Sequence, residues 1–137
     1  CPLPIVIPMH PRTESRLHLF GLYHRLTRAE NIMILPPLGY LDFLILMKHC
    51  KVIITDSGGL QEEATAPQIK KRVVVIREST ERPEAVSAGF ASVVGTRKKA
   101  ILRGIESMTK RRKLPKSPYG DGKAANRILG VIREELQ

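Results

Sequence analysis

Residues 52–63 have the sequence Val-Ile-Ile-Thr-Asp-Ser-Gly-Gly-Leu-Gln-Glu-Glu, in which an apolar run leads into a glycine-rich turn. The apolar run at 52–54 predicts a buried strand, and residues 60–66 predict a helix. The glycines let a ligand approach the backbone with no Cβ in the way, and the first N–H groups of the helix could bind an anion. One interpretation is a phosphate or diphosphate site at residues 57–59. The other is a tight strand-to-helix turn capped by Asp56 or Ser57.

Short apolar runs alternate with helical patterns along the whole chain. We expect strands over residues 3–9, 31–35, 52–55, 73–76 and 92–95, and helices over residues 13–26, 42–49, 60–66, 83–89, 100–109 and 124–136. Uninterrupted apolar runs such as residues 73–76 are typical of a parallel sheet buried on both faces. The sequence therefore predicts an α/β fold with a Rossmann-like parallel sheet and flanking helices.

Several helix boundaries can be predicted from single residues. Thr13 is a candidate N-cap for the first helix, and Gly21 weakens that helix without forbidding it. Pro83 suits the first turn of a helix, and Gly89 is a candidate C-cap of the same helix. The last helix is amphipathic, with Ile128, Leu129, Ile132 and Leu136 on one side.

Ligands bind beyond the carboxyl ends of the strands in such sheets. Four polar or glycine-rich segments follow expected strands: His10 and residues 38–43, 57–59 and 78–82. We expect them to converge on one rim of the sheet.

The charge and the cysteines limit the classes of partner. The 137 residues carry a net charge of +10, with basic runs at residues 70–72, 97–99 and 110–113. These runs lie at expected loops and helix ends, where solvated charge is the usual explanation, and no aromatic residue interleaves with them. We therefore expect no nucleic-acid partner. Cys1 and Cys50 suggest neither a disulfide framework nor a zinc site, which favours a reducing, cytoplasmic setting.

Two further expectations concern the extent of the chain. No run of about 18 apolar residues occurs, so we expect no membrane span. The chain begins with Cys1 in an apparent strand, so we expect it to be part of a longer protein.

Five motifs occur in order along the chain. They are Pro-Met-His-Pro-Arg-Thr at residues 8–13, the loop at 36–43, Thr-Asp-Ser-Gly-Gly-Leu-Gln-Glu-Glu-Ala at 55–64, Thr-Glu-Arg-Pro-Glu at 80–84 and Ser-Pro-Tyr-Gly-Asp-Gly at 117–122. Together they resemble the non-hydrolysing UDP-N-acetylglucosamine 2-epimerases. The resemblance covers essentially the whole chain but only the C-terminal half of that family.

The resemblance implies that residues 1–137 form the UDP-sugar-binding C-terminal domain of a glycosyltransferase-B architecture. The full enzyme would interconvert UDP-GlcNAc and UDP-ManNAc by eliminating UDP and adding it back to the other face. It would need an N-terminal domain as its partner and no cofactor or metal, and it would commonly be a homodimer.

The resemblance also implies roles for residues near the glycine turn. Ser57, Gly58 and Gly59 match the diphosphate-binding turn, Glu63 matches the carboxylate that holds the ribose hydroxyls, and Arg82 matches the arginine near the diphosphate and sugar. The chemistry agrees, because a carboxylate accepts hydrogen bonds from a diol and a guanidinium presents a fork of donors. Without the resemblance, Glu63 and Arg82 could equally be solvated surface residues.

The remaining matches lie earlier in the chain. Phe43 matches the aromatic residue beside the uracil, and the backbone at Leu38, Gly39 and Tyr40 matches the segment that contacts the base edge. His10 matches a histidine that lies near a second, activating UDP-GlcNAc in some bacterial relatives. On the residues alone, Phe43 is a core residue and His10 a hydrogen-bonded turn histidine.

Two departures from the family pattern limit the prediction. Many members have glutamine where this chain has Leu38, so a side-chain contact to the base is lost. The family's acid/base carboxylates and its Gly-His-Arg-Arg-Glu motif lie in the N-terminal half, before Cys1. We therefore assign no catalytic residue and expect this chain alone to be inactive. The alternatives are a stand-alone UDP-sugar-binding or regulatory module and the donor-binding half of a glycosyltransferase.

Overall fold

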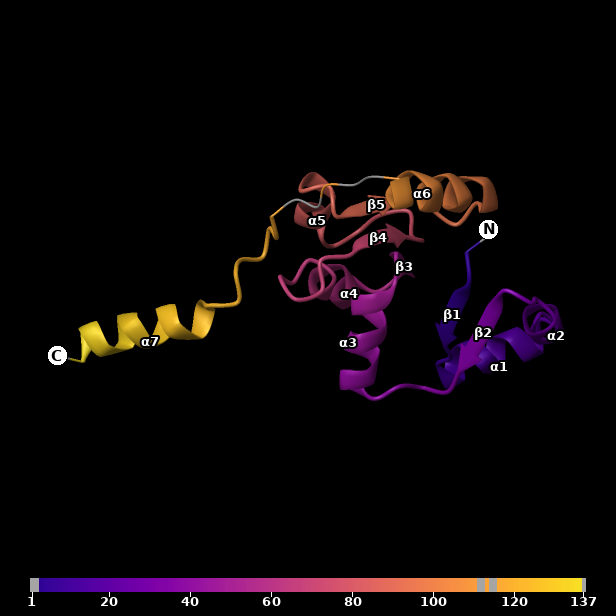
Figure 1. Ribbon diagram of the computed structural model, residues 1–137, viewed down its shortest axis with the longest axis horizontal. Helices are drawn as coiled ribbons and strands as arrows, with labels where there is room; N and C mark the ends of the chain where they lie inside the picture. The colour runs from indigo at the N-terminus through magenta and orange to yellow at the C-terminus, as the bar shows by residue number, and fades with distance from the viewer. Residues whose placement is uncertain (1–2, 111–112, 114–115, 137) are drawn as a thin grey trace. The chain divides into compact units, whose positions relative to one another are not determined.

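The computed structural model describes residues 3–110, 113 and 116–136. The chain forms two compact units, which divide between Phe43 and Leu44. Strands and helices alternate along it, and all the strand pairs described are parallel, so the α/β prediction is confirmed (Figure 1). The elements are β1 (Ile5–Pro8), α1 (Pro11–Leu19), α2 (Tyr23–Thr27), β2 (Ile32–Leu35), α3 (Tyr40–His49), β3 (Val52–Thr55), α4 (Gly58–Glu63), β4 (Arg72–Val75), α5 (Pro83–Ser87), β5 (Ala91–Val93), α6 (Lys98–Lys110) and α7 (Ala124–Glu135).

The first unit pairs β1 with β2 and carries α1 and α2. Two predictions were wrong here. The N-cap of α1 is His10, whose Nδ1 accepts a hydrogen bond from the N–H of Arg12, so Thr13 lies inside the helix. The expected single helix is broken, because Gly21 adopts a φ of +64°, a conformation that glycine tolerates without steric cost.

The second unit holds a parallel sheet in the order β3-β4-β5. Val73, Val74 and Val75 of its central strand have no exposed surface. Alternate residues of a strand point to opposite faces, so this sheet is covered on both sides, as the apolar run predicts. Val74 packs with Ile105 and Met108 of α6, which lies along one face of the sheet. Burial of one such side chain stabilises a fold by about 1.5–3 kcal/mol.

Arg72 differs from the expectation that the basic runs are solvated. It is the first residue of β4 and only 6% exposed. Its guanidinium donates from Nη1 to the carbonyl of Gly89 at 2.8 Å and from Nη2 to the carbonyl of Lys113. The arginine therefore ties β4 to the end of the α5 segment and to the chain beyond α6. Arg111 and Arg112 of the third basic run lie outside the described residues.

The expected helix at residues 60–66 is displaced. α4 begins at Gly58, with Ser57 as its N-cap, and ends at Glu63, before Pro67. At the next helix Pro83 is the first residue of α5, as predicted, whereas the C-cap is Ala88 and Gly89 is the residue after it, with a φ of +79°.

The last helix forms as expected, and its apolar side chains are exposed. Ile128, Leu129 and Ile132 of α7 each expose about half of their surface, at 58%, 51% and 47%. Among the described helices, none combines the length and the apolar character that a bilayer crossing requires.

Gly104 provides a direct test of how closely α6 packs on the sheet. A Cβ at this position would lie 2.7 Å from Val94 Cγ1 and 3.3 Å from Val74 Cγ1. Alanine normally favours a helix over glycine, but here we expect overpacking to dominate. Gly104→Ala should lower the free energy of unfolding by about 1–2 kcal/mol, measured by urea denaturation.

Gly130→Ala is the matched control, because Gly130 also lies within a helix and a Cβ there meets nothing within 4 Å. It should leave the free energy of unfolding unchanged or raise it. Equal effects of the two substitutions would contradict the close packing of α6 on β4.

Candidate functional site

The turn between β3 and α4 is held by its own hydroxyl groups. Thr55 Oγ1 accepts a hydrogen bond from the N–H of Ser57 at 3.0 Å, and Ser57 Oγ accepts one from the N–H of Leu60 at 3.5 Å. Gly58 and Gly59 form the first turn of α4, and among the described residues their N–H groups have no acceptor. α4 has only 6 residues, so its dipole is small, and what the turn offers a ligand is the two N–H donors.

Arg82 lies beside this turn. A Cβ on Gly58 would lie 3.8 Å from Glu81 Oε2 and 3.9 Å from the guanidinium carbon of Arg82, in ordinary van der Waals contact with both. Nη1 of Arg82 donates to the carbonyl of Glu81 at 2.9 Å, and Nε contacts Glu62 Oε1 as an ion pair. The structure thus brings the Arg82 cation, which is paired with Glu62, together with two glycines and two backbone donors within one unit, and the Glu81 carboxylate lies beside Gly58.

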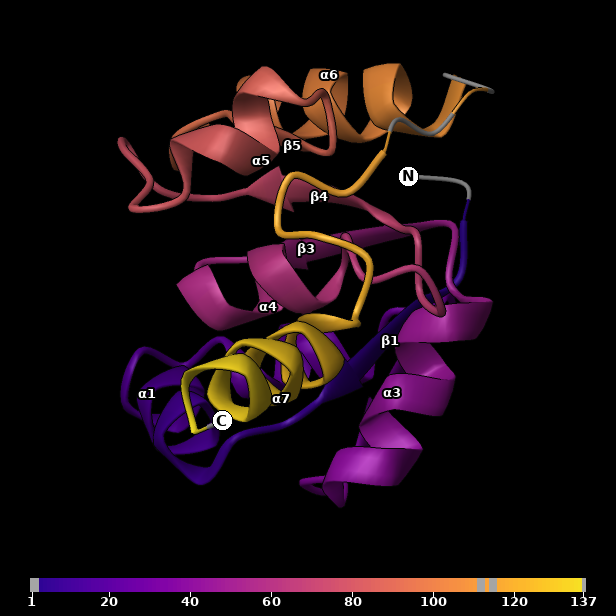
Figure 2. The ribbon, with the colours of Figure 1, turned by 90° about the vertical axis from the view of Figure 1, so that its left-hand side faces the viewer.

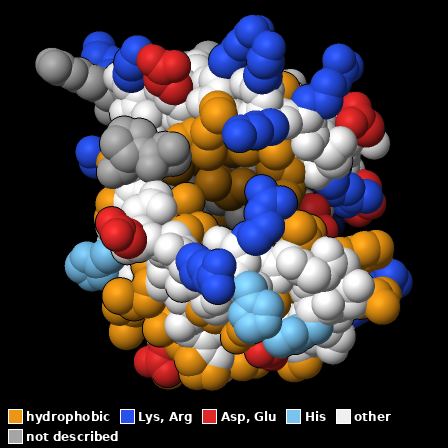
Figure 3. Space-filling view, turned by 90° about the vertical axis from the view of Figure 1, so that its right-hand side faces the viewer, with side chains coloured by type: hydrophobic (Ala, Val, Ile, Leu, Met, Phe, Trp, Pro, Cys, Tyr) orange, Lys and Arg blue, Asp and Glu red, His pale blue; other side chains and the backbone are white. Residues whose placement is uncertain are grey.

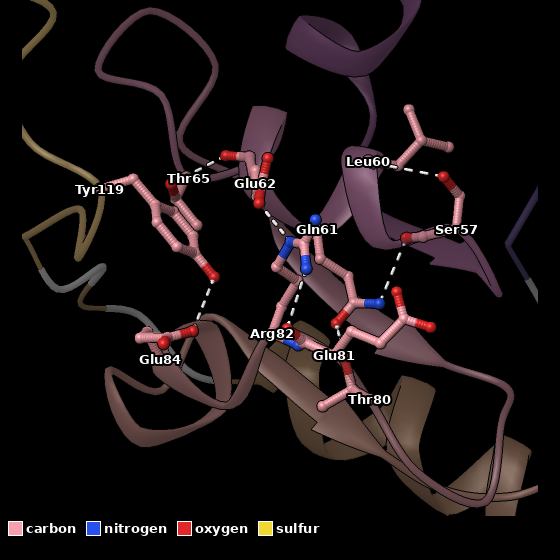
Figure 4. Close-up of polar contacts among 10 residues, drawn as sticks. All are labelled: Ser57, Leu60, Gln61, Glu62, Thr65, Thr80, Glu81, Arg82, Glu84 and Tyr119. Carbon is pink, nitrogen blue, oxygen red and sulfur yellow. Dashed lines mark hydrogen bonds and ion pairs between the residues drawn. The ribbon is translucent and has the colours of Figure 1, made fainter.

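Gln61 joins the turn to the Arg82 loop, as Figure 4 shows. Its side chain has no exposed surface. Nε2 donates to the carbonyl of Ser57 at 3.2 Å, and Oε1 accepts from Thr80 Oγ1 at 2.6 Å. Thr80 Oγ1 in turn accepts from the N–H of Arg82 at 3.1 Å. Sequence reasoning assigned no role to Gln61 or Thr80. The sequence feature that could have pointed to Gln61 is a side-chain amide on the face of a short helix that turns toward the core.

Glu63 is the last residue of α4 and half-buried. Its Oε2 is shielded from solvent, and among the described residues it has no hydrogen-bond partner. A shielded carboxylate oxygen is costly unless a donor reaches it. The hydrogen-bonding capacity of this Glu63 oxygen is therefore unmet among the described residues.

The segment after α6 contributes to the same region. Residues 116–122 run past α5 and α4 (Figure 2), where Ser117 Oγ lies 2.9 Å from Thr65 Oγ1 and Tyr119 donates its hydroxyl to Glu84 Oε2 at 3.4 Å. Burial, followed by the negative charges of Glu84 and Glu62, raises the pKa of the Tyr119 phenol. Tyr119 therefore remains a neutral hydrogen-bond donor at neutral pH.

The other predicted site residues belong to the first unit. Leu38 is half-buried, and Gly39 and Tyr40 are exposed at the start of α3. Phe43 is half-buried one turn into α3, where its N–H donates to the carbonyl of Gly39 at 3.0 Å. His10 is the N-cap of α1, which confirms the interpretation of a hydrogen-bonded turn histidine. Convergence of two segments, residues 57–59 and 78–82, is confirmed within the second unit, and convergence of all four stays a prediction.

A hollow lies where β5 ends and α6 begins. It has a volume of about 430 Å³, and its charged lining residues are Glu78, Arg97, Lys99 and Arg103. Figure 3 shows Lys and Arg side chains gathered over α6. This lining is exposed, whereas the Ser57 turn combines an arginine with shielded polar groups. In the part of the chain described, no three His, Cys, Asp or Glu side chains are placed to hold a metal ion.

Comparison with known proteins identifies relatives along nearly the whole chain. The family model described as UDP-N-acetylglucosamine 2-epimerase matches residues 2–133. The UDP-N-acetylglucosamine 2-epimerase of Methanocaldococcus jannaschii is 40% identical over 128 residues, which are 93% of this chain and 34% of that protein. The enzyme of the same name from Escherichia coli K12 is 39% identical over 137 residues, which are 96% of this chain and 35% of that protein. The chain thus spans about a third of the length of these relatives.

Solved structures give the same result. The M. jannaschii epimerase structure matches with a TM-score of 0.89 and 39% identity, covering 95% of this chain and 36% of that one. A second structure of that enzyme, in complex with UDP-GlcNAc and UDP, matches with a TM-score of 0.83, and the Neisseria meningitidis epimerase bound to UDP-GlcNAc matches with a TM-score of 0.73. The parallel sheets and flanking helices therefore correspond to part of a known enzyme fold, and the chain belongs to the UDP-N-acetylglucosamine 2-epimerase family.

Proposed function

We propose that this chain binds the UDP part of a UDP-sugar and forms the nucleotide-binding C-terminal domain of an enzyme that interconverts UDP-GlcNAc and UDP-ManNAc. The observation that carries the proposal is the position of the Arg82 guanidinium against Gly58. A diphosphate seated on residues 57–59 would meet the N–H groups of Gly58 and Gly59 and the fork of donors on Arg82. Related structures with UDP-GlcNAc and UDP bound support the choice of ligand.

The carboxylate of Glu63 supplies the ribose contact in this proposal. A carboxylate has only acceptors and therefore pairs with the two hydroxyl donors of a diol. Oε2 of Glu63 is shielded and without a partner among the described residues, so two ribose hydroxyl groups would satisfy a group that otherwise raises the free energy of the site.

The uracil would bind at the first turn of α3. We propose that Phe43 lies beside the base and that the backbone of residues 38–40 contacts its edge. Leu38 offers no polar side chain, so recognition of the base there rests on backbone groups. His10, whose Nδ1 already accepts from Arg12, has its other ring nitrogen left for a regulatory nucleotide-sugar.

In the proposed reaction, this chain binds and stabilises UDP, the leaving group. When the bond between the sugar and UDP breaks, negative charge develops on the diphosphate oxygens. Donors that are already in place stabilise that charge without reorganising, and Arg82 and the two glycine N–H groups are such donors. Inversion at C2 also requires a base that removes the C2 proton. By family analogy that base belongs to an N-terminal domain, which would complete the site in a cytoplasmic, commonly dimeric enzyme.

Arg82→Ala and Glu63→Ala should each weaken UDP binding to this chain. Loss of hydrogen bonds to a charged group costs about 1.5–3 kcal/mol, which corresponds to roughly 10- to 150-fold in affinity. Isothermal titration calorimetry with UDP measures the change.

Arg127→Ala and Glu106→Ala are the controls, because each removes a charge of the same sign at an exposed position elsewhere, from ion pairs with Asp121 and Lys110 respectively. Both should bind UDP like the unaltered chain. Undiminished affinity in the Arg82 and Glu63 variants would overturn the site assignment.

The 137-residue chain alone should not convert UDP-GlcNAc to UDP-ManNAc. It can hold the leaving group, but the proposed base for the C2 proton lies outside it. Incubation of the purified chain with UDP-GlcNAc, followed by proton NMR of the sugar signals, is the test. Appearance of UDP-ManNAc would show that the acid/base groups are within these residues.

A further inference from the structure

We propose that Gln61 is a positioning residue of the nucleotide site, which acts through Thr80 to hold Arg82 in register with the glycine turn. This inference rests on the proposed function and adds a residue to it. Gln61 would not touch the nucleotide. Its side chain would instead set the distance between the two halves of the diphosphate site, the turn at residues 57–59 and the guanidinium of Arg82.

The direction of each hydrogen bond in this chain of contacts is fixed by chemistry. The backbone N–H of Arg82 can only donate, so Thr80 Oγ1 accepts from it at 3.1 Å. The one hydroxyl proton of Thr80 is then free to donate to Gln61 Oε1 at 2.6 Å. The carbonyl of Ser57 can only accept, so Gln61 Nε2 donates to it at 3.2 Å. A residue with a donor and an acceptor on one planar group is required at position 61.

The two ends of Gln61 reach segments that the sequence separates. Ser57 lies four residues before it and caps α4, whereas Thr80 lies 19 residues later, beyond β4. Figure 4 shows the amide between these segments, with Arg82 alongside. Because the Gln61 side chain has no exposed surface, water cannot replace either bond. A shift of the Arg82 loop would therefore break a buried hydrogen bond.

Substitution of Gln61 by glutamate distinguishes the hydrogen-bonding role of the side chain from its packing in the interior. Gln61→Glu keeps the shape and the acceptor for Thr80. When ionised, the new carboxyl has no proton to donate to the Ser57 carbonyl, and burial disfavours its charge. When protonated, it regains a donor. The loss of UDP affinity in Gln61→Glu should therefore depend on pH, and it should be smaller at acidic pH.

The experiment is calorimetry of UDP binding to the 137-residue chain at pH 8 and pH 5.5, with each affinity divided by that of the unaltered chain at the same pH. For Gln61→Glu we expect binding about tenfold weaker at pH 8, the effect of losing the hydrogen bond to the Ser57 carbonyl and leaving that acceptor without a donor. At pH 5.5 the loss should fall to about threefold or less, since the protonated carboxyl restores the donor. Gln68→Glu adds the same charge at an exposed position after α4 and should give a ratio near one at both values.

A ratio for Gln61→Glu that stays near one, or that falls equally at both pH values, would overturn the positioning role while leaving the proposed function intact. Absence of UDP binding by the unaltered chain would instead overturn the proposed function.

Two variants of Thr80 test the positioning role if Gln61→Glu does not fold at pH 8. Thr80→Val removes the relay hydroxyl, whereas Thr80→Ser keeps it. We expect Thr80→Val to weaken UDP binding about tenfold and to accelerate hydrogen exchange at the Arg82 amide, which loses its acceptor. Thr80→Ser should restore both. Equal binding and equal Arg82 exchange in the two variants would contradict the role of the relay.

Discussion

The side-chain amide of Gln61 is excluded from solvent, so it must find both of its hydrogen-bond partners inside the protein. A buried donor or acceptor without a partner costs about 1–3 kcal/mol, and this constraint holds the candidate site together. Satisfying it requires the Ser57 carbonyl on one side and the Thr80 hydroxyl on the other. The glycine turn and the Arg82 loop then lie next to each other, although β4 separates them along the chain.

The sheet of the second unit sets the positions from which those segments start. β3 and β4 are adjacent and parallel, so the turn after β3 and the loop after β4 emerge at the same edge. Val74 of β4 packs beneath α6 at Gly104, and Val73 and Val75, on the other face, are also fully buried, which leaves the central strand little freedom to move. Arg72 adds hydrogen bonds to the carbonyls of Gly89 and Lys113. A rigid sheet thus presents two loops, and one buried amide fixes the spacing between them.

The sequence predicts those features that local patterns determine. The apolar run at residues 73–76 predicts β4, and Pro83 and Gly89 mark the ends of α5, because each depends on neighbouring residues alone. The break at Gly21 is not predicted, since apolar spacing continues across it on one helical face. Arg72 resembles a solvated charge within a basic run, and its acceptors lie far along the chain. The contact between Gln61 and Thr80 cannot be predicted from the sequence either, because no local pattern connects the two residues. The contact between Arg82 and Gly58 likewise depends on the tertiary fold.

NMR titration of the 15N-labelled chain with UDP would show whether the glycine turn and Arg82 together bind the diphosphate. We expect the largest shifts at the backbone amides of Gly58 and Gly59 and at the Arg82 Nε signal. The basic residues around the hollow at the start of α6 should change little. Shifts centred on Arg97, Lys99 and Arg103 instead, or the absence of shifts at the glycine amides, would contradict this site assignment.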